Sequence, residues 1–317
     1  MNKKVLITGS AGFLGSHLVE HHLSIGDVVH GVDNFSSSNK SSNHHKKLVS
    51  NSNYFFVKCD ISSQEFVGKS KNLEFDIIYN FACPASPPRY QEIPVETMMT
   101  CVTGTKNVIS IAKKNTVVVH ASTSEVYGDP EISPQKESYR GSVNPYGPRS
   151  CYDEGKRAAE ALCYDYRNKY DIDVRLVRIF NTYGPQMDIK DGRVVTNFIG
   201  QALKGKPLTV YGDGSQTRSF CYVSDLIRGI TTLSSIGSNP GGPINIGNPN
   251  EFTVLDLAKK VKDRFGSQIE FKPLPVDDPL QRKPDISLAE KLLSWQPVVQ
   301  LDEGLDKTIE YFRSIDV

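Results

Sequence analysis

The segment KVLITGSAGFLG, residues 4–15, decides the fold. Residues 4–8 form a short apolar run, typical of a buried strand, and a turn with Gly9, Gly12 and Gly15 follows. After the turn, apolar side chains recur every three or four residues from Phe13 to Leu23, which indicates a helix. A strand, a glycine-rich turn and a helix in this order predict the first unit of a doubly wound α/β sheet that binds a dinucleotide.

Further strand-like runs alternate with amphipathic stretches as far as residue 180. The predicted strands cover residues 27–32, 54–58, 75–80, 117–120 and 174–179, and the longest predicted helices cover residues 92–114 and 152–170. This alternation predicts a parallel sheet with helices on both faces. Residues 36–53 are rich in serine and asparagine and are expected to form a mobile loop beside the adenosine end of the cofactor.

The composition of the sequence changes after residue 180: proline and glycine become frequent, and the predicted elements become shorter. We therefore expect residues 1–180 to form a Rossmann-type domain and residues 181–317 to form mainly a smaller α/β domain for the substrate. Segments near residues 220–248 are expected to return to the first domain.

Composition excludes several classes of protein. A formal net charge of +1 argues against a general nucleic-acid or membrane-surface binder, and no apolar run is long enough for a membrane span. The N-terminus opens directly into a strand, so no signal peptide is expected. The six cysteines show no CxxC pair and no metal-ligand spacing. We therefore expect a cytoplasmic protein with reduced thiols and no metal.

The glycine turn and the strand ends predict the cofactor site. Glycines let the backbone approach a pyrophosphate, whose charge lies at the N-terminus of the following helix. Asp33, at the end of the second strand, is expected to accept the ribose hydroxyls and to repel the extra phosphate of NADP, so the predicted cofactor is NAD. The alternative is that Asp33 is a turn residue. The other residues expected near the cofactor are Phe13, Leu14, Asn34, Phe35, Asp60 and Ile61.

Tyr152 and Lys156 form a Y-x-x-x-K pattern, which places both side chains on one face of a helix. A free tyrosine, with a pKa near 10, is a poor base at neutral pH. Lys156 and a positively charged nicotinamide ring together are expected to lower that pKa by ~2–3 units. The phenolate would then take a hydroxyl proton while hydride leaves for NAD. The segment STSEVYG, residues 122–128, follows a predicted strand that should end beside the nicotinamide.

These segments together resemble the UDP-glucuronate decarboxylases, or UDP-xylose synthases, of the extended short-chain dehydrogenase/reductase superfamily. The resemblance runs from about Lys3 to the C-terminal helix and rests on the GxxGxxG turn, STSEVYGDP, NPYGPRSCYDEGKRAAE, RIFNTYGP, DGRVVTNF, PLTVYGDGSQTRSF and QRKPDI. It implies a Rossmann domain with a smaller nucleotide-sugar domain, and dimers formed through a helical bundle. The family's catalytic residues fall on Thr123, Glu125, Tyr152, Lys156 and Arg282.

This chain departs from the family pattern at a few positions. Ser10 replaces a common glycine of the phosphate turn, Cys83 stands where a serine is usual, and the ribose loop reads NFSSS from Asn34. None of these changes removes a catalytic group.

The resemblance also implies a reaction. Tyr152 takes the proton of the sugar 4-hydroxyl with Thr123 sharing the hydrogen bond, and hydride passes to NAD. The resulting 4-ketone lies β to the carboxylate, so carbon dioxide leaves, and NADH then reduces the 4-keto pentose. Arg282 and Glu125 are expected to position the carboxylate and help deliver a proton, without a fixed division of roles. The expected contacts to the UDP-sugar are Pro84, Arg89, Ser124, Asn181, Arg193, Asn197, Tyr211, Arg218 and Arg282.

Alternatives remain at this point. Nucleotide-sugar 4,6-dehydratases carry Asp-Glu after the threonine, where this chain has Ser124, and 4-epimerases lack the glutamate. A dehydratase, an epimerase or a non-catalytic dinucleotide-binding scaffold would each use the same fold, but a scaffold would not need Thr123, Tyr152 and Lys156 together. Arg193 and Arg218 have an alternative as surface ion-pair formers. The alternative for Arg282 is a local ion-pair network with Asp277, Asp278 and Asp285.

Overall fold

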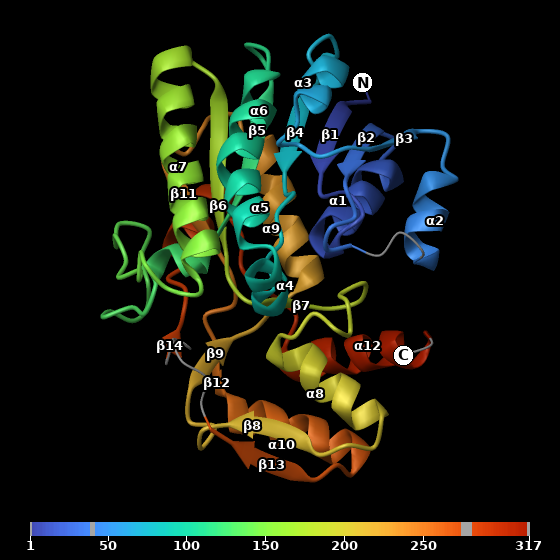
Figure 1. Ribbon diagram of the computed structural model, residues 1–317, viewed down its shortest axis with the longest axis vertical. Coiled ribbons are helices and arrows are strands. Elements are labelled where there is room, and N and C mark those ends of the chain that lie inside the picture. Colours follow the sequence, from blue (N-terminus) through green and yellow to red (C-terminus); the bar gives the residue numbers. More distant parts are fainter. Residues whose placement is uncertain (1, 39–41, 274–280, 316–317) are drawn as a thin grey trace.

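A computed structural model describes residues 2–38, 42–273 and 281–315 of the chain. Its largest element is a parallel seven-stranded sheet in the order β11-β6-β5-β4-β1-β2-β3, which confirms the predicted doubly wound α/β class (Figure 1). The chain order reverses between β1 and β4, the switch point at which such sheets bind ligands. The strands are β1 (Lys4–Thr8), β2 (Val28–Asp33), β3 (Tyr54–Lys58), β4 (Ile77–Asn80), β5 (Val117–Thr123), β6 (Asp173–Ile179) and β11 (Pro243–Ile246).

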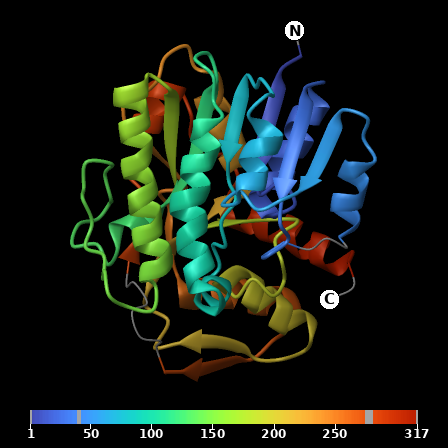
Figure 2. The same cartoon turned by 45° about the horizontal axis from the view of Figure 1, so that its top comes forward.

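Helices cover both faces of this sheet because alternate side chains of each strand point to opposite faces. Ile7 of β1 belongs to a core shared with Leu18 of α1 and Leu226 of α9, whereas Leu6 belongs to a core shared with Phe66 of α3 and Val108 of α6. Figure 2 shows the two helical layers on either side of the strands. The covering helices are α1 (Phe13–Ser24) and α9 (Val223–Ser235) on one face, and α3 (Gln64–Ser70), α6 (Thr105–Ser110) and α7 (Ser150–Tyr170) on the other.

The long helix predicted over residues 92–114 is interrupted in the structure. It comprises α4 (Pro87–Glu92), α5 (Pro94–Met99), a π-helical segment (Thr100–Gly104) and α6. Pro94 separates the first two helices, because proline has no N–H to donate and is tolerated only in the first turn of a helix.

The loop predicted over residues 36–53 is partly wrong, since it contains helix α2 (Asn43–Val49). Ser42 caps this helix by accepting a hydrogen bond from His45 N at 3.1 Å. The buried side chain of Leu48 then attaches the helix to the core beside β3. A serine cap followed by a single buried leucine is a weak pattern, which explains the error.

Most of the chain after residue 180 forms a smaller part below the carboxyl ends of the large sheet (Figure 1). Strand β11 lies in the large sheet instead, beside β6, and α11 (Ser287–Leu293) packs against β11 and α9. The domain boundary at residue 180 stays a prediction. The remaining elements are β7 (Thr182–Tyr183), α8 (Val194–Leu203), β8 (Leu208–Tyr211), β9 (Thr217–Ser219), β10 (Cys221–Tyr222), β12 (Glu251–Thr253), α10 (Val254–Phe265), β13 (Ile269–Lys272), β14 (Gln281–Arg282) and α12 (Leu301–Arg313).

Within the ranges that the structure describes, no helix combines the length and the apolar character needed to cross a membrane.

Candidate active site

A cavity of about 1930 Å³ lies at the carboxyl ends of the strands, with walls from the large sheet and from the smaller part. This volume is ample for a dinucleotide and a nucleotide sugar together. All of the predicted site residues line it: Gly9, Gly12, Phe13, Leu14, Gly15, Asp33, Asn34, Phe35, Asp60, Ile61, Pro84, Arg89, Thr123, Ser124, Glu125, Tyr152, Lys156, Asn181, Arg193, Asn197, Tyr211, Arg218 and Arg282.

The glycine turn after β1 leaves room that any side chain would fill. Gly9 has a positive φ of 71°, and a Cβ built on Gly15 would lie 2.0 Å from the carbonyl oxygen of Gly9. Among the residues that the structure describes, no side chain caps the N-terminus of α1, so its first N–H groups remain available to an anion. This backbone cradle fits the pyrophosphate of a dinucleotide.

Asp33 is buried at the end of β2, and its carboxylate already has partners. One oxygen accepts from Ala11 N at 3.1 Å, and the other accepts from Phe35 N and Ser38 Oγ, each at 2.7 Å. These are the contacts expected of a turn residue. A carboxylate has about four acceptor sites, so the same group can also accept from a ribose hydroxyl. Both interpretations of Asp33 are therefore compatible with the geometry.

The adenosine side of the cavity is formed by the ends of β2 and β3. Asn34 Nδ2 donates to Asp60 Oδ2 at 2.9 Å, which ties the two strand ends together. Phe35 adopts a positive φ of 62° and packs edge-on against His45 of α2. Ile61 follows Asp60 and is buried.

Tyr152 and Lys156 of α7 face the end of β5. Lys156 Nζ donates to the carbonyl of Ala121 at 2.7 Å and lies 5.9 Å from the centre of the Tyr152 ring. Burial raises the pKa of Tyr152 well above its ordinary value, although a hydrogen bond with Thr123 acts in the opposite direction. Lys156 by itself does not offset this burial. The lowered pKa expected from the sequence therefore depends on the positive charge of the nicotinamide.

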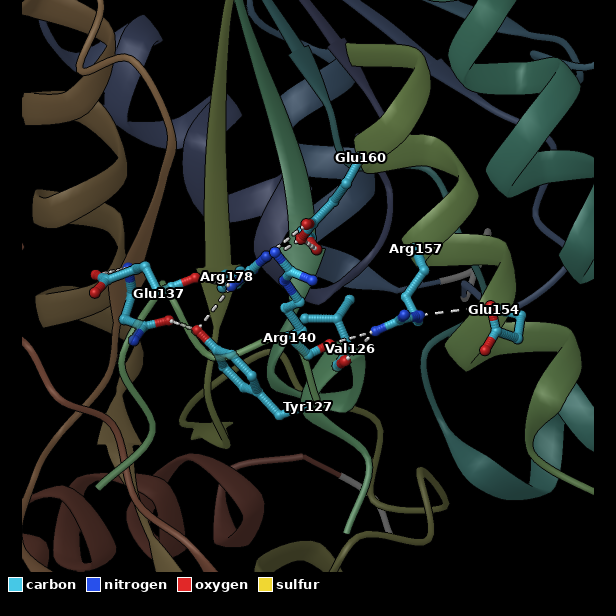
Figure 3. Close-up of polar contacts among 10 residues, drawn as sticks. Val126, Tyr127, Glu137, Arg140, Glu154, Arg157, Glu160 and Arg178 are labelled. Atoms are coloured by element: carbon cyan, nitrogen blue, oxygen red, sulfur yellow. Dashed lines mark hydrogen bonds and ion pairs between the residues drawn. The ribbon is translucent and has the colours of Figure 1, made fainter. Parts of the chain in front are cut away.

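A bidentate ion pair fixes α7 against the sheet (Figure 3). Arg178 of β6 donates to both carboxylate oxygens of Glu160, at 2.9 and 2.7 Å, and also to the hydroxyl of Tyr127 at 3.0 Å. Ser122 of β5 donates to the same glutamate at 2.5 Å. Charge-assisted forks of this kind hold a definite geometry, so the helix that carries Tyr152 is held in register with β5.

Glu125 follows β5 and is held between two arginines from distant parts of the chain. The two terminal nitrogens of Arg282, on β14, lie 3.2 Å from Oε1 and 3.3 Å from Oε2 of Glu125. Arg149, at the start of α7, places its Nη2 2.5 Å from the same Oε2. Burial would raise the pKa of Glu125, but Arg282 and Arg149 more than offset it and lower the pKa to about 2. Glu125 is therefore ionised at neutral pH.

Arg282 is buried, and its guanidinium has further partners, Ser124 Oγ at 3.2 Å and the carbonyl of Gly128 at 2.9 Å. Of the three acids in the alternative explanation, Asp277 and Asp278 lie outside the described residues, and Asp285 accepts from Ser287 N. Among the residues that the structure describes, the acidic partner of Arg282 is thus Glu125. Both terminal nitrogens are engaged, so a substrate carboxylate would have to share or displace these contacts.

Two residues of this cluster, Arg149 and Asp153, were missed by sequence reasoning. Asp153 is buried, one oxygen lies 3.8 Å from Arg149 Nε, and the other has no hydrogen-bond partner among the described residues. Burial and the nearby Glu125 raise the pKa of Asp153 to about 7. The i,i+4 spacing of Arg149 and Asp153 around Tyr152 is the signal that would have found them.

Tyr90 of α4 was also missed. Its ring stacks on that of Tyr152 with centroids 5.0 Å apart and an interplanar angle of 3°. Its buried hydroxyl has no partner within the described part of the chain. Nothing in the spacing of the sequence links α4 to α7, so this contact needs the tertiary structure.

The remaining predicted substrate residues lie on the cavity wall with contacts of their own. Arg193 donates from Nε and Nη2 to the two carboxylate oxygens of Asp191, at 2.5 and 2.9 Å. The alternative explanation of Arg193, as a residue that forms an ion pair, is therefore compatible with the structure. Arg89 Nε donates to the carbonyl of Ser36 at 2.7 Å, and Arg218 donates to the carbonyl of Thr217 at 2.9 Å. The others are Pro84 after β4, Asn181 after β6, Asn197 on α8 and the partly exposed Tyr211 on β8.

Comparison with known proteins is consistent with this geometry. Residues 5–247 match the NAD dependent epimerase/dehydratase family. UDP-glucuronic acid decarboxylase 1 of Danio rerio is 49% identical over 313 residues, which cover 98% of this chain and 72% of that protein. UDP-glucuronic acid decarboxylase 6 of Arabidopsis thaliana is 49% identical over 316 residues, covering 98% and 89%.

Among solved structures, UDP-glucuronic acid 4-epimerase from Bacillus cereus, in complex with UDP-glucuronic acid and NAD, superimposes with a TM-score of 0.86. It is 28% identical, and the match covers 98% of this chain and 99% of that one. The chain therefore belongs to the NAD dependent epimerase/dehydratase family and, within it, to the UDP-glucuronic acid decarboxylases.

Proposed function

We propose that this protein is an NAD-dependent enzyme that decarboxylates UDP-glucuronate to UDP-xylose. The observation that carries the proposal is Glu125 held between Arg282 and Arg149, in the same cavity as Tyr152 and the glycine turn. The relatives named UDP-glucuronic acid decarboxylases support the same reaction.

The charge of the cluster suits an acidic sugar. Arg149 and Arg282 each carry one positive charge, Glu125 is ionised, and Asp153 is neutral below its pKa of about 7. Two positive charges and one negative charge leave one positive charge on the cavity wall. This excess can stabilise one further carboxylate, which UDP-glucuronate has and UDP-glucose lacks.

We propose that the glycine turn, the end of β2 and the end of β3 hold NAD. When bound, NAD would accept a hydride from C4 of the sugar and return it after decarboxylation. Tyr152 takes the proton of the 4-hydroxyl and later gives it back, and Thr123 shares that hydrogen bond. Lys156 remains close enough to stabilise the phenolate.

Oxidation at C4 makes the sugar a β-keto acid, so the electrons of the bond to the carboxyl carbon can move into the ketone as carbon dioxide leaves. We propose that Arg282 and Arg149 position the carboxylate for this step. Glu125 holds no proton at neutral pH, so its role is to orient the two arginines and to shape the charge of the wall. The enolate that remains must take up a proton at C5, and Asp153 is the acid of this cluster that retains a proton near neutral pH.

The UDP part is proposed to lie against the smaller part of the molecule. The residues suited to it are polar or aromatic and line the same cavity: Asn181, Arg193, Asn197, Tyr211 and Arg218, with Pro84, Arg89 and Ser124 nearer the sugar.

The product of UDP-glucuronate and NAD, identified by mass spectrometry, tests this function. A decarboxylase gives a UDP-sugar that is lighter by carbon dioxide, a dehydratase gives one lighter by water, and a 4-epimerase leaves the mass unchanged. Ser124 favours the first outcome, because a hydroxyl cannot replace the acid that a dehydratase needs. An unchanged mass or the loss of water would contradict the proposal.

We also propose a homodimer formed through α5 and α7, which pack against each other. Their surface exposes large apolar side chains, Val95 and Met99 on α5 and Tyr164 on α7, at 69%, 46% and 66% of their maximum. Val95→Glu should shift the sedimentation coefficient toward that of a monomer. Phe55→Glu, a change at a similarly exposed apolar residue on β3, should not.

The compartment stays a prediction. All six cysteines are free thiols, which is consistent with the reducing cytoplasm that the sequence predicts.

A further inference from the structure

Two cysteines that are 18 residues apart meet beneath the catalytic helix. Cys83 follows β4 and Cys101 lies in the π-helical segment, and their sulfur atoms are 3.3 Å apart. Cys101 is buried, whereas Cys83 lines the large cavity. A small molecule in the cavity can therefore reach one thiol, and that thiol touches the other.

The pair is packed directly against the part of α7 that carries the general base. A Cβ built on Gly155, between Tyr152 and Lys156, would lie 3.1 Å from the Cβ of Cys101 and 3.3 Å from its sulfur. There is consequently no spare room between Cys101 and the helix. A shift of Cys101 must be accommodated by α7 or by the loop that carries Cys83.

The two thiols differ in their chemistry. The hydrogen bond from Cys101 lowers the pKa of the Cys83 thiol, and the nearby Lys156 adds to this effect against burial. The same hydrogen bond and burial raise the pKa of Cys101 well above its ordinary value. A thiol with a lowered pKa that is reachable from a cavity, beside a second thiol, is the arrangement found in oxidation-sensitive cysteine pairs.

We propose that Cys83 and Cys101 form an oxidisable dithiol, which a small hydroperoxide entering the cavity converts into an intramolecular disulfide that lowers turnover. The Cys83 thiolate attacks one peroxide oxygen, the O–O bond breaks, and a sulfenic acid forms on Cys83 while the leaving hydroxide takes up the proton released by the thiol, as water. The sulfur of Cys101 then attacks that of Cys83, the S–O bond breaks, and the hydroxyl leaves with the Cys101 proton as water. The two thiols lose two electrons and two protons, and hydrogen peroxide is reduced to two waters.

The disulfide should lower turnover because the two sulfurs must come closer by ~1.2 Å to reach a bond length of about 2.05 Å. That movement draws in the cavity wall at Pro84 or displaces α7 at Gly155. Either shift changes the distance between Tyr152 and the sugar. A misplacement of about 1 Å can cost on the order of 100-fold in rate, so a loss of at least about tenfold is expected.

The test uses the full chain treated with hydrogen peroxide, followed by alkylation of the remaining thiols in denaturant and peptide mass spectrometry. We expect a linked peptide joining Cys83 and Cys101, which dithiothreitol separates again, while Cys59, Cys163 and Cys221 stay alkylatable. Turnover of UDP-glucuronate in the same samples should fall at least about tenfold and recover with dithiothreitol. The mass measurement does not depend on the proposed function, whereas the turnover measurement rests on it, so the two can fail separately.

Two variants isolate the pair. Cys101→Ser should retain turnover before treatment and should keep it after treatment. Cys151→Ser, which changes a half-buried thiol beside Tyr152 that is outside the pair, should lose turnover as the unmodified chain does. If Cys101→Ser does not fold, Cys83→Ser tests the same point, since it should also keep its turnover after treatment. The proposal is overturned if both thiols remain alkylatable after peroxide, if the disulfide forms without loss of turnover, or if Cys101→Ser is inactivated as fast as the unmodified chain.

Discussion

Replacing Arg282 with lysine tests how the charged cluster works. The guanidinium of Arg282 reaches both carboxylate oxygens of Glu125, the hydroxyl of Ser124 and the carbonyl of Gly128. A lysine ammonium keeps the charge but is a single point that cannot span both oxygens of Glu125 and the other two partners. The Arg282→Lys change therefore removes the fork and leaves the net charge unaltered.

The expected size of the effect follows from the hydrogen bonds that lysine cannot make. A hydrogen bond to a charged group contributes roughly 1.5–3 kcal/mol. The lysine variant lacks at least one of the hydrogen bonds that the guanidinium makes when the substrate carboxylate is bound for reaction. That corresponds to a decrease of about 10- to 100-fold in kcat/KM for UDP-glucuronate. Full removal of one partner of a buried pair costs ~3–5 kcal/mol of stability, so the charge-preserving lysine should cost less than this.

Kinetics with UDP-glucuronate, calorimetric binding of plain UDP and thermal unfolding together separate the possible roles. Binding of UDP should hardly change, because UDP has no sugar carboxylate. Arg264→Lys is the matched control, since Arg264 pairs with Asp302 and Asp306 and does not line the cavity. If UDP affinity falls as much as turnover, or if stability collapses while the remaining folded enzyme works normally, Arg282 has only a structural role.

Three further changes address the base, the cofactor and the acid of the cluster. Tyr152→Phe should still bind NAD but lose oxidation by a factor on the order of 100 or more, and a residual rate within about tenfold would assign the base to another group. Asp33→Ala should weaken NAD and relax discrimination against NADP in fluorescence titrations, whereas an unchanged preference would leave Asp33 as a turn residue. The pKa of Asp153 is raised from 3.8 to about 7 in the fold, so the stability it contributes is full below pH 3.8 and is lost as pH rises through 7. The difference in the free energy of unfolding between Asp153→Asn and the unmodified chain should therefore grow in favour of the variant by roughly 2–3 kcal/mol from pH 5 to pH 8, measured by urea titration. A difference that does not change with pH would contradict the raised pKa.

Features set by neighbouring residues could be predicted from the sequence. Strands β1 and β3 have the predicted bounds, because each is a continuous apolar run bordered by turn residues. The Y-x-x-x-K spacing was sufficient to place Tyr152 and Lys156 on one face of α7. Strand β5 runs three residues further than predicted, to Thr123, because polar side chains there are buried by the cavity wall and not exposed in a loop.

Features that depend on distant contacts required the structure. Glu125 and Arg282 are 157 residues apart, and only the resemblance to a family linked them. Arg149 was visible one turn before Tyr152, but nothing local shows that it reaches Glu125. The raised pKa of Tyr152 could not be predicted by adding the effects of nearby charges. Burial, which the sequence does not reveal, has the largest effect on it.

The central claim is that NAD is reduced and reoxidised within one turnover while the sugar loses its carboxyl group. UDP-glucuronate that carries deuterium at C4 tests this most directly, with mass spectrometry of the product and absorbance of NADH recorded together. We expect UDP-xylose that retains the deuterium, carbon dioxide equal to the substrate consumed, and no proportional build-up of free NADH. Loss of the deuterium, or NADH accumulating in step with carbon dioxide, would contradict the claim.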